Sequence, residues 1–125
     1  MDNVRIVLSG FDELKKAIER NPKTVINETK NFIQRALAQY RSGIQNNPWR
    51  IGMSGGGSPV ATGNLRDTHF SKVETFDGFI RPTASYAGAV HKDRPWLDFV
   101  FQDKMTEVNE LEKELLDKII KDLAL

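Results

Sequence analysis

The chain has 125 residues, the length of one domain, and 39% of them are hydrophobic, a share that argues against a disordered protein. Its 18 lysines and arginines and 17 aspartates and glutamates give a formal charge of only +1, which argues against a protein that coats nucleic acid. Cysteine is absent, which excludes disulfides, thiol nucleophiles and cysteine-ligated metal sites, and no apolar run approaches the ~20 residues of a membrane-spanning helix.

The N-terminal segment predicts a strand and a short helix. Val4, Ile6 and Leu8 alternate with their neighbours at the period of two that a β-strand shows. Residues 11–20 follow, with acidic residues in the first turn and one apolar stripe, which indicates a short helix. The pair Asn21–Pro22 ends this helix and begins the next, because asparagine is a common cap and proline suits the first helical position.

Residues 22–42 predict a long amphipathic helix. Apolar side chains recur there at steps of three and four, the spacing that gathers them on one helical face. They are Val25, Ile26, Phe32, Ile33, Ala36, Leu37, Tyr40 and Ile44. A stripe of this kind packs against the core of a domain.

Residues 43–61 predict a flexible glycine-rich arm. Its glycines, prolines and asparagines break helices and strands, and a loop longer than ~12–15 residues in a compact domain is commonly functional or disordered. The arm also carries Trp49, Ile51 and Met53, apolar side chains that are unfavourable to leave in water. Two interpretations stay open: the arm is mobile and docks on a partner, or it is a loop that tucks Trp49 onto its own core.

The pair Asp77–Gly78 lies between extended segments at 68–76 and 79–83 and predicts a β-hairpin. Asp-Gly is favoured in two-residue turns because both positions need a positive φ. Phe76 and Phe79 would then form a cross-strand pair beside the turn.

Residues 96–125 predict a long C-terminal helix, and residues 86–90 before it fit either a strand or a short helix. No glycine or proline interrupts the long helix, and Pro95 fixes its start. The helix would be about 45 Å long, against a radius of gyration of roughly 14 Å for such a domain. Since the apolar stripe continues to Leu123, we expect another subunit to cover the end; the alternative is a bent or frayed end lying back on the body.

These elements predict an α+β fold in a single domain over residues 1–125, with a small antiparallel β-sheet packed against the long amphipathic helix and the long C-terminal helix. The net charge divides along it: +2 over residues 1–40, +3 over 41–95 and −4 over 96–125. The acidic last helix of one copy can therefore complement the basic body of another. The alternative is an acidic helix face that is simply solvated.

Catalytic and metal-binding motifs are not recognisable in the sequence. The two histidines match no zinc spacing; His91 with Asp93 would be a weak metal site at most, and His91 is expected to be an exposed loop residue. Residues 55–58 lack the lysine of a phosphate-binding loop, and residues 52–56 miss the frame of a serine nucleophile elbow. We therefore expect no enzyme, no metal, no cofactor and no small-molecule substrate.

Three motifs resemble a family of long-tailed phage proteins. They are Thr62-Gly63-Asn64-Leu65-Arg66 at the end of the arm, Tyr86-Ala87 after the hairpin, and Arg94-Pro95-Trp96-Leu97 before the final helix. Their order and spacing are similar to those of the small neck or tail-component proteins, the gene-product-ten-like family. The chain departs from the family in two places: Ala61 stands where an acid is usual, and residues 90–93 run directly into Arg94, where an acidic, glycine-containing stretch is usual.

The resemblance implies a structural protein of virion assembly, a head–tail joining or tail-completion component of a phage or prophage that acts as a ring subunit without catalysis. Such rings are commonly six- or twelve-fold. The implied partners are further copies of the chain and neighbouring connector or tail proteins, with unspecific contact to DNA in the channel and no membrane. The implied location is the head–tail interface of the virion, and the host cytoplasm before assembly.

Two groups of residues carry expected roles. We expect the partner or oligomer interface to include Trp49, Arg50, Arg66, Arg81, Arg94, Glu107, Glu110 and Glu114, with the last three arginines meeting the glutamates of a neighbouring copy. The fold is expected to depend on Gly63, Asn64, Leu65, Tyr86, Pro95, Trp96 and Leu97. Within this group Gly63 allows a sharp turn, Asn64 caps the turn that follows, and Trp96 seals the last helix against the sheet.

The rival interpretation is a small nucleic-acid-binding or regulatory protein that uses the basic middle segment. A basic patch near Trp49, whose ring would stack on a base, would then consist of Arg41, Arg50, Arg66, Lys72, Arg81, Lys92 and Arg94. The near-zero net charge and the lack of a recognisable nucleic-acid-binding motif speak against it.

Overall fold

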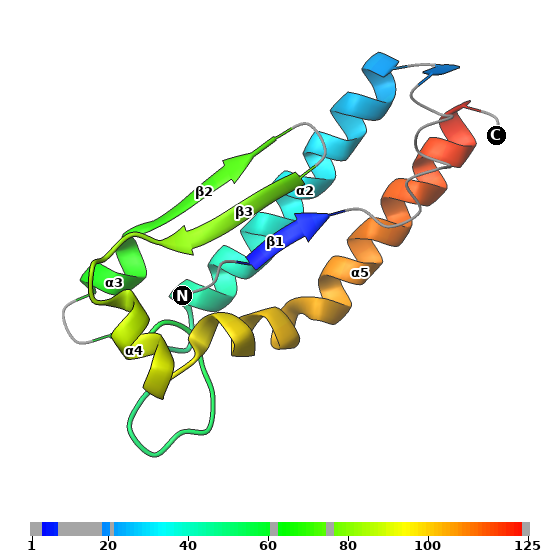
Figure 1. The fold of residues 1–125 in the computed structure, drawn as a ribbon. Helices are drawn as coiled ribbons and strands as arrows, with labels where there is room; N and C mark the ends of the chain where they lie inside the picture. Colours follow the sequence, from blue (N-terminus) through cyan, green and yellow to red (C-terminus); the bar gives the residue numbers. More distant parts are fainter. Residues whose placement is uncertain (1–3, 8–18, 21, 61–62, 75–76, 124–125) are drawn as a thin grey trace.

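The structure, a computed structural model of the chain, describes residues 4–7, 19–20, 22–60, 63–74 and 77–123 (Figure 1). Its elements are, in chain order, β1 (Val4–Val7), α2 (Pro22–Gln45), α3 (Asn64–Asp67), β2 (His69–Val73), β3 (Asp77–Pro82), α4 (Ala87–Asp93) and α5 (Trp96–Leu123). The predicted short helix over 11–20 lies outside the described residues except at 19–20, which are helical, and Leu8 of the predicted strand lies outside them too. Residues 86–90, which fitted a strand or a helix, contribute to helix α4.

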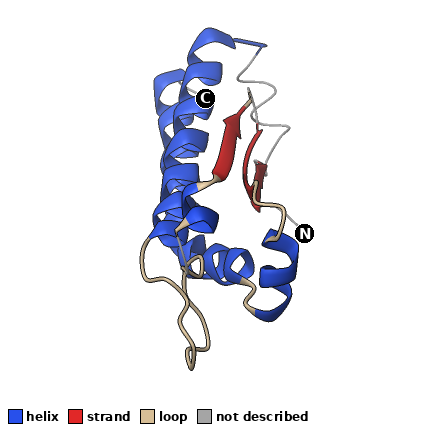
Figure 2. Ribbon diagram, turned by 90° about the vertical axis from the view of Figure 1, so that its left-hand side faces the viewer, coloured by secondary structure: helices blue, strands red, loops and turns tan. Residues whose placement is uncertain are grey.

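The predicted α+β class is confirmed: a small antiparallel sheet packs against two long helices. The sheet has three strands in the order β1-β3-β2, so the last strand in the sequence is the central one and pairs with both others. Figure 2 shows α2 and α5 along one side of the sheet, which gives two layers.

The β2–β3 hairpin is present, but the prediction that Asp77–Gly78 forms its turn is wrong. Gly78 pairs with Val73 inside the ladder, and the reversal lies earlier, where the Glu74 N–H donates to the Asp77 carbonyl at 2.7 Å. A Cβ atom at Gly78 would lie 2.5 Å from the Ile33 side chain of α2. Glycine is therefore needed here so that the helix can approach the strand closely, rather than for the backbone of a tight turn.

The change of register also changes the aromatic pairing that the sequence predicts. Phe79 lies opposite Lys72, and Phe76 is outside the described residues. The ring that contacts Phe79 is that of Phe70 on β2, with ring centroids 5.9 Å apart. Phe70 and Phe79 thus lie on the sheet face that points away from α2.

Helices α2 and α5 lie side by side (Figure 1). Most of their apolar side chains pack together in one cluster. The apolar stripe predicted for α2 is buried except at Ile26, which is half-buried, and the apolar positions of α5 that face it are buried too. Fully buried side chains include Val25, Ile33, Ile44, Ile80, Trp96 and Val100. This layer between the helices and β3 is the core of the domain.

The expectation that α5 outruns the cover of its own core is wrong for the part of the helix whose side chains are described. Leu115 and Ile119 are only 5% and 3% exposed. The reason is that α2, itself 24 residues long, packs against α5 and covers these positions, whereas Phe101 and Met105 nearer the start of α5 are 37% and 39% exposed. The side chain of Leu123 lies outside this description.

Candidate docking groove

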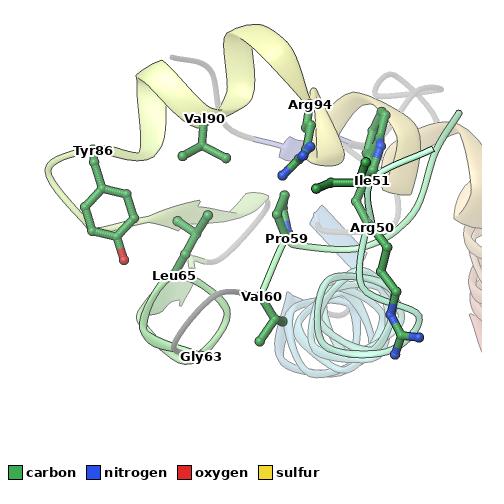
Figure 3. Close-up of a pocket in the computed structure, with 10 residues that line it drawn as sticks. Arg50, Ile51, Pro59, Val60, Gly63, Leu65, Tyr86, Val90 and Arg94 are labelled. Atoms are coloured by element: carbon green, nitrogen blue, oxygen red, sulfur yellow. The ribbon is translucent and has the colours of Figure 1, made fainter. Parts of the chain in front are cut away.

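An open groove of about 590 Å³ lies at one end of the molecule, between the arm, α3 and α4 (Figure 3). It is lined by Trp49, Arg50, Ile51, Pro59, Val60, Gly63, Leu65, Tyr86, Val90 and Arg94. In Figure 3, Val90 and Arg94 extend from α4 and its end, Leu65 projects from α3, and the arm supplies Ile51, Pro59 and Val60. Three segments that are distant in the sequence therefore meet here.

One wall of the groove is built by α3 and α4. Gly63, at the N-terminus of α3, has a left-handed φ of 86°, a conformation in which glycine is favoured. Asn64 was expected to cap α3, but Gly63 occupies the cap position, and the Asn64 amide instead donates to the Tyr86 hydroxyl at 2.8 Å. This hydrogen bond ties α3 to the start of α4, where Tyr86 and Val90 follow each other on one helical face.

The arm forms the other wall, and its base is held against the body of the domain. The Trp49 N–H donates to the Gly57 carbonyl at 3.2 Å, and the Ser58 N–H donates to the Ile44 carbonyl at 2.8 Å. A Cβ atom at Gly57 would lie 2.4 Å from the Gly43 carbonyl oxygen, so the backbones approach too closely for a side chain. The glycine run of the arm therefore reflects tight packing of its base.

The position of Trp49 agrees with the interpretation in which this side chain tucks onto its own core. Trp49 is half-buried, and its ring packs edge-on against Phe99 of α5, with the ring centroids 6.1 Å apart. Its indole N–H donates to the Met53 carbonyl at 3.1 Å. Trp49 thus tucks onto its own domain. The tip beyond it does not, because Ile51 is 89% exposed and Met53 is exposed as well.

The charge of the groove is positive. Its described lining residues include two arginines, Arg50 and Arg94, and no carboxylate, and Figure 3 shows the Arg50 guanidinium extending past the arm, away from the apolar lining. Neither arginine side chain has an ion pair or hydrogen bond with any described residue, whereas Arg35 lies 3.6 Å from Glu114. The groove therefore combines apolar walls with two cations that have no counter-charge.

The other predicted interface arginines lie elsewhere. Arg66 is not among the residues that line the groove; its Nε donates to its neighbour Asp67 at 2.9 Å, and this hydrogen bond lowers the pKa of the Asp67 carboxyl. Arg81 lies on the outer face of the sheet, with its guanidinium 5.6 Å from the centre of the Phe70 ring. Of the three arginines expected to meet the glutamates of a neighbouring copy, only Arg94 lines the groove, and Arg81 lies on the sheet.

The predicted glutamates follow one another along α5 at steps of three and four residues. Glu107 and Glu110 are exposed on the helix, whereas Glu114 already has Arg35 of α2 beside it. Of the predicted interface residues, Trp49, Arg50 and Arg94 gather at the groove, together with Gly63, Leu65 and Tyr86 of the motifs. Ile51, Val60 and Val90 were missed as site residues, although treating 86–90 as a helix would have put Val90 beside Tyr86.

A buried cluster behind the groove holds the Trp96 motif. The Trp96 indole N–H donates to His69 Nε2 at 3.2 Å, and His69 Nδ1 lies 3.3 Å from the Arg66 carbonyl, so the neutral ring with its proton on Nδ1 satisfies both contacts. Burial lowers the pKa of His69. His91 was expected to be an exposed loop residue, but its side chain is largely buried on α4 and packs edge-on against Trp96.

The chemistry elsewhere in the described part of the chain is sparse. No three His, Asp or Glu side chains among those residues gather as a metal site would require. None of the described helices is both long and apolar enough to cross a membrane. Comparison with known proteins gives no match: no family model, no curated protein and no solved structure matches the chain.

Proposed function

We propose that the chain is a structural component of a long-tailed phage or prophage virion, a head–tail joining or tail-completion protein that acts as a ring-forming subunit without catalysis. One observation carries this proposal. The three motifs that resemble the neck and tail-component family are separated in the sequence, yet Gly63, Leu65, Tyr86 and Arg94 from these motifs line a single groove. Residues that share one surface can serve one role, and here that role is docking.

The composition of the groove supports docking rather than catalysis. None of its described lining side chains is a carboxylate, histidine, serine or lysine, and the one hydroxyl among them, that of Tyr86, accepts a hydrogen bond from Asn64. Exposed apolar side chains with arginine and tyrosine among them are typical of protein interfaces. The structural role that we propose needs neither a membrane nor a metal ion, and a protein-binding surface of this kind is sufficient for it.

A ring requires two different patches on each copy, since a head-to-tail contact joins one surface to another. The basic body and the acidic C-terminal segment supply two patches of opposite charge, with a net charge of +3 over residues 41–95 and −4 over residues 96–125. This pairing supports a heterologous interface. The family resemblance implies rings of six or twelve copies, and the proposal includes this symmetry.

Reconstitution tests the proposal. A phage or prophage that lacks this gene is expected to release separate DNA-filled heads and finished tails, and added purified protein is expected to join them into infective particles. Electron microscopy and plaque counts measure both outcomes. Normal virions in the absence of the gene would contradict the proposal, and tails that lack their normal length would place the protein at another assembly step.

A second candidate, binding of nucleic acid, is favoured by the outer face of the sheet. Phe70 is 44% exposed there beside Arg81, and Lys72 extends from the same face. Aromatic rings with adjacent cations are the usual elements of single-strand binding. Salt-dependent binding of an oligothymidine that is lost in Phe70→Ala would support this candidate; only weak, sequence-independent binding would be expected of a ring that passes DNA.

A further inference from the structure

We infer that the groove binds a short acidic and apolar segment of a different protein, whose apolar side chains fill the space between Ile51, Val60 and Tyr86 and whose carboxylates meet Arg50 and Arg94. The inference rests on the proposed function in that it names the chemistry of a partner of the joining protein. Its physical basis is the groove itself.

The apolar part follows from size and exposure. A volume of about 590 Å³ lies within the range of ~300–1,000 Å³ in which proteins hold ligands, and it accommodates several side chains of a peptide. Ile51 and Tyr86 face each other across it and are 89% and 44% exposed, while Leu65 and Val90 form buried and half-buried parts of the lining. Covering these surfaces removes apolar area from water, which favours an apolar occupant.

The acidic part follows from charge. Arg94 is half-buried at the end of α4 and Arg50 is exposed on the arm, and neither has a carboxylate among the described residues within ion-pair distance. Among the described arginines, Arg35 and Arg66 do have carboxylate partners, Glu114 and Asp67. A guanidinium that gains a carboxylate in a partly desolvated groove contributes more than one in open solvent.

A second copy of the chain fits this groove less well through its acidic helix. Over the stretch from Glu107 to Asp117, the apolar residues Val108 and Leu115 are buried against α2. The exposed side of this stretch carries mostly carboxylates, and its remaining apolar residues, Leu111 and Leu116, are themselves half-buried. A separate acidic and apolar segment satisfies both features of the groove.

The two tryptophans supply a test with an internal control. The Trp49 indole lines the groove, whereas Trp96 is fully buried. In a ¹H–¹⁵N spectrum of the full chain, titration with a synthetic peptide that alternates leucine and aspartate is expected to shift the Trp49 indole signal saturably and to leave the Trp96 signal in place. Unmoved or equally moved signals would overturn the inference.

Matched peptides and variants separate the two contributions. Replacing aspartate by asparagine, or leucine by serine, in the peptide is expected to weaken binding about tenfold. Arg94→Gln is expected to lose about tenfold and Arg50→Gln about threefold, whereas Arg81→Gln removes the same charge from the sheet and should bind as the wild type does. Equal binding of the asparagine peptide, or an equal loss in Arg81→Gln, would refute the acidic recognition.

Ile51→Ser provides a variant that does not disturb the core, since Ile51 contacts solvent over most of its surface. Its affinity for the peptide is expected to fall at least threefold. Concentration-dependent self-association that is lost in Ile51→Ser and Arg94→Gln would show that a second copy occupies the groove, which would overturn the choice of partner.

Failure of the inference and failure of the proposed function give different results. If head–tail joining works with wild type and equally with Ile51→Ser and Arg94→Gln, the function stands and the groove inference is wrong. If the peptide binds with the expected variant pattern but deletion of the gene leaves virion assembly normal, the groove is a docking site and the proposed function is wrong.

Discussion

The two tryptophans mark two regions of the molecule that are built differently. Trp96 lies among α2, β2 and α4 with no exposed surface, and both of its neighbours that contact its ring edge-on are histidines. Trp49 lies half-buried at the edge of the groove, beside the exposed Ile51. Both indole N–H groups are hydrogen-bonded, so the difference between the regions lies in how much apolar surface remains uncovered.

This contrast separates folding from docking. Burial around Trp96 stabilises the folded state, because apolar area is removed from water there within one chain. The surfaces around Trp49 and Ile51 contribute little to folding and stay available for a partner. Substitutions in the first region are therefore expected to change stability, and those in the second to change binding.

The largest expected effect comes from exchanging each tryptophan for alanine. Trp96→Ala should lower the free energy of unfolding by about 3–5 kcal/mol, since it empties a fully buried site and leaves His69 Nε2 without its donor. Trp49→Ala should lower it by only about 1–2 kcal/mol, in keeping with its partial burial. Urea denaturation measures both, and equal losses would contradict the separation of the two regions.

A smaller effect is expected where α2 meets β3. Gly78→Ala should destabilise the fold by about 1–3 kcal/mol, because the new Cβ atom would lie 2.5 Å from the Ile33 side chain. In an Ile33→Ala background the same substitution should be milder, since the clashing atom is gone. A double-mutant cycle by chemical denaturation measures this coupling, and additive losses would refute the close contact.

Lowering the pH tests the region around Trp96 through the titration of His69. Burial lowers the pKa of His69 in the folded state, so the unfolded chain binds this proton first as the pH falls. Stability is therefore full above about pH 6.5 and declines below it, with a limiting slope of about 1.4 kcal/mol per pH unit. His69→Gln should flatten this decline in urea midpoints measured from neutral to mildly acidic pH; an unchanged decline would assign it to other groups.

The smallest effect on stability is expected at the groove. Ile51→Ser should change the free energy of unfolding by less than about 0.5 kcal/mol, because the side chain is almost fully exposed in the folded state. Thermal and urea unfolding check this value. A loss comparable to that of Trp49→Ala would show that the arm tip contributes to the fold after all.

Local sequence patterns were sufficient for the elements that repeat regularly. The steps of three and four in α2 and α5 predicted both long helices, and the α+β class followed from them and from the extended segments. The hairpin position was not predictable from Asp77–Gly78, because the glycine is selected by the approach of Ile33 from another part of the chain. No local signal records such a contact.

The sequence by itself determined the two long helices, the extended segments of the hairpin, the absence of thiol chemistry and the division of charge, since these depend on residue type and local periodicity. Only the tertiary structure decided which side chains share a surface. It brought Leu65, Tyr86 and Arg94 to one groove, placed Arg81 on the outer face of the sheet, and packed α2 against α5. The reason is geometric, because the direction of a side chain depends on how its element packs on others, and packing is a property of the whole chain.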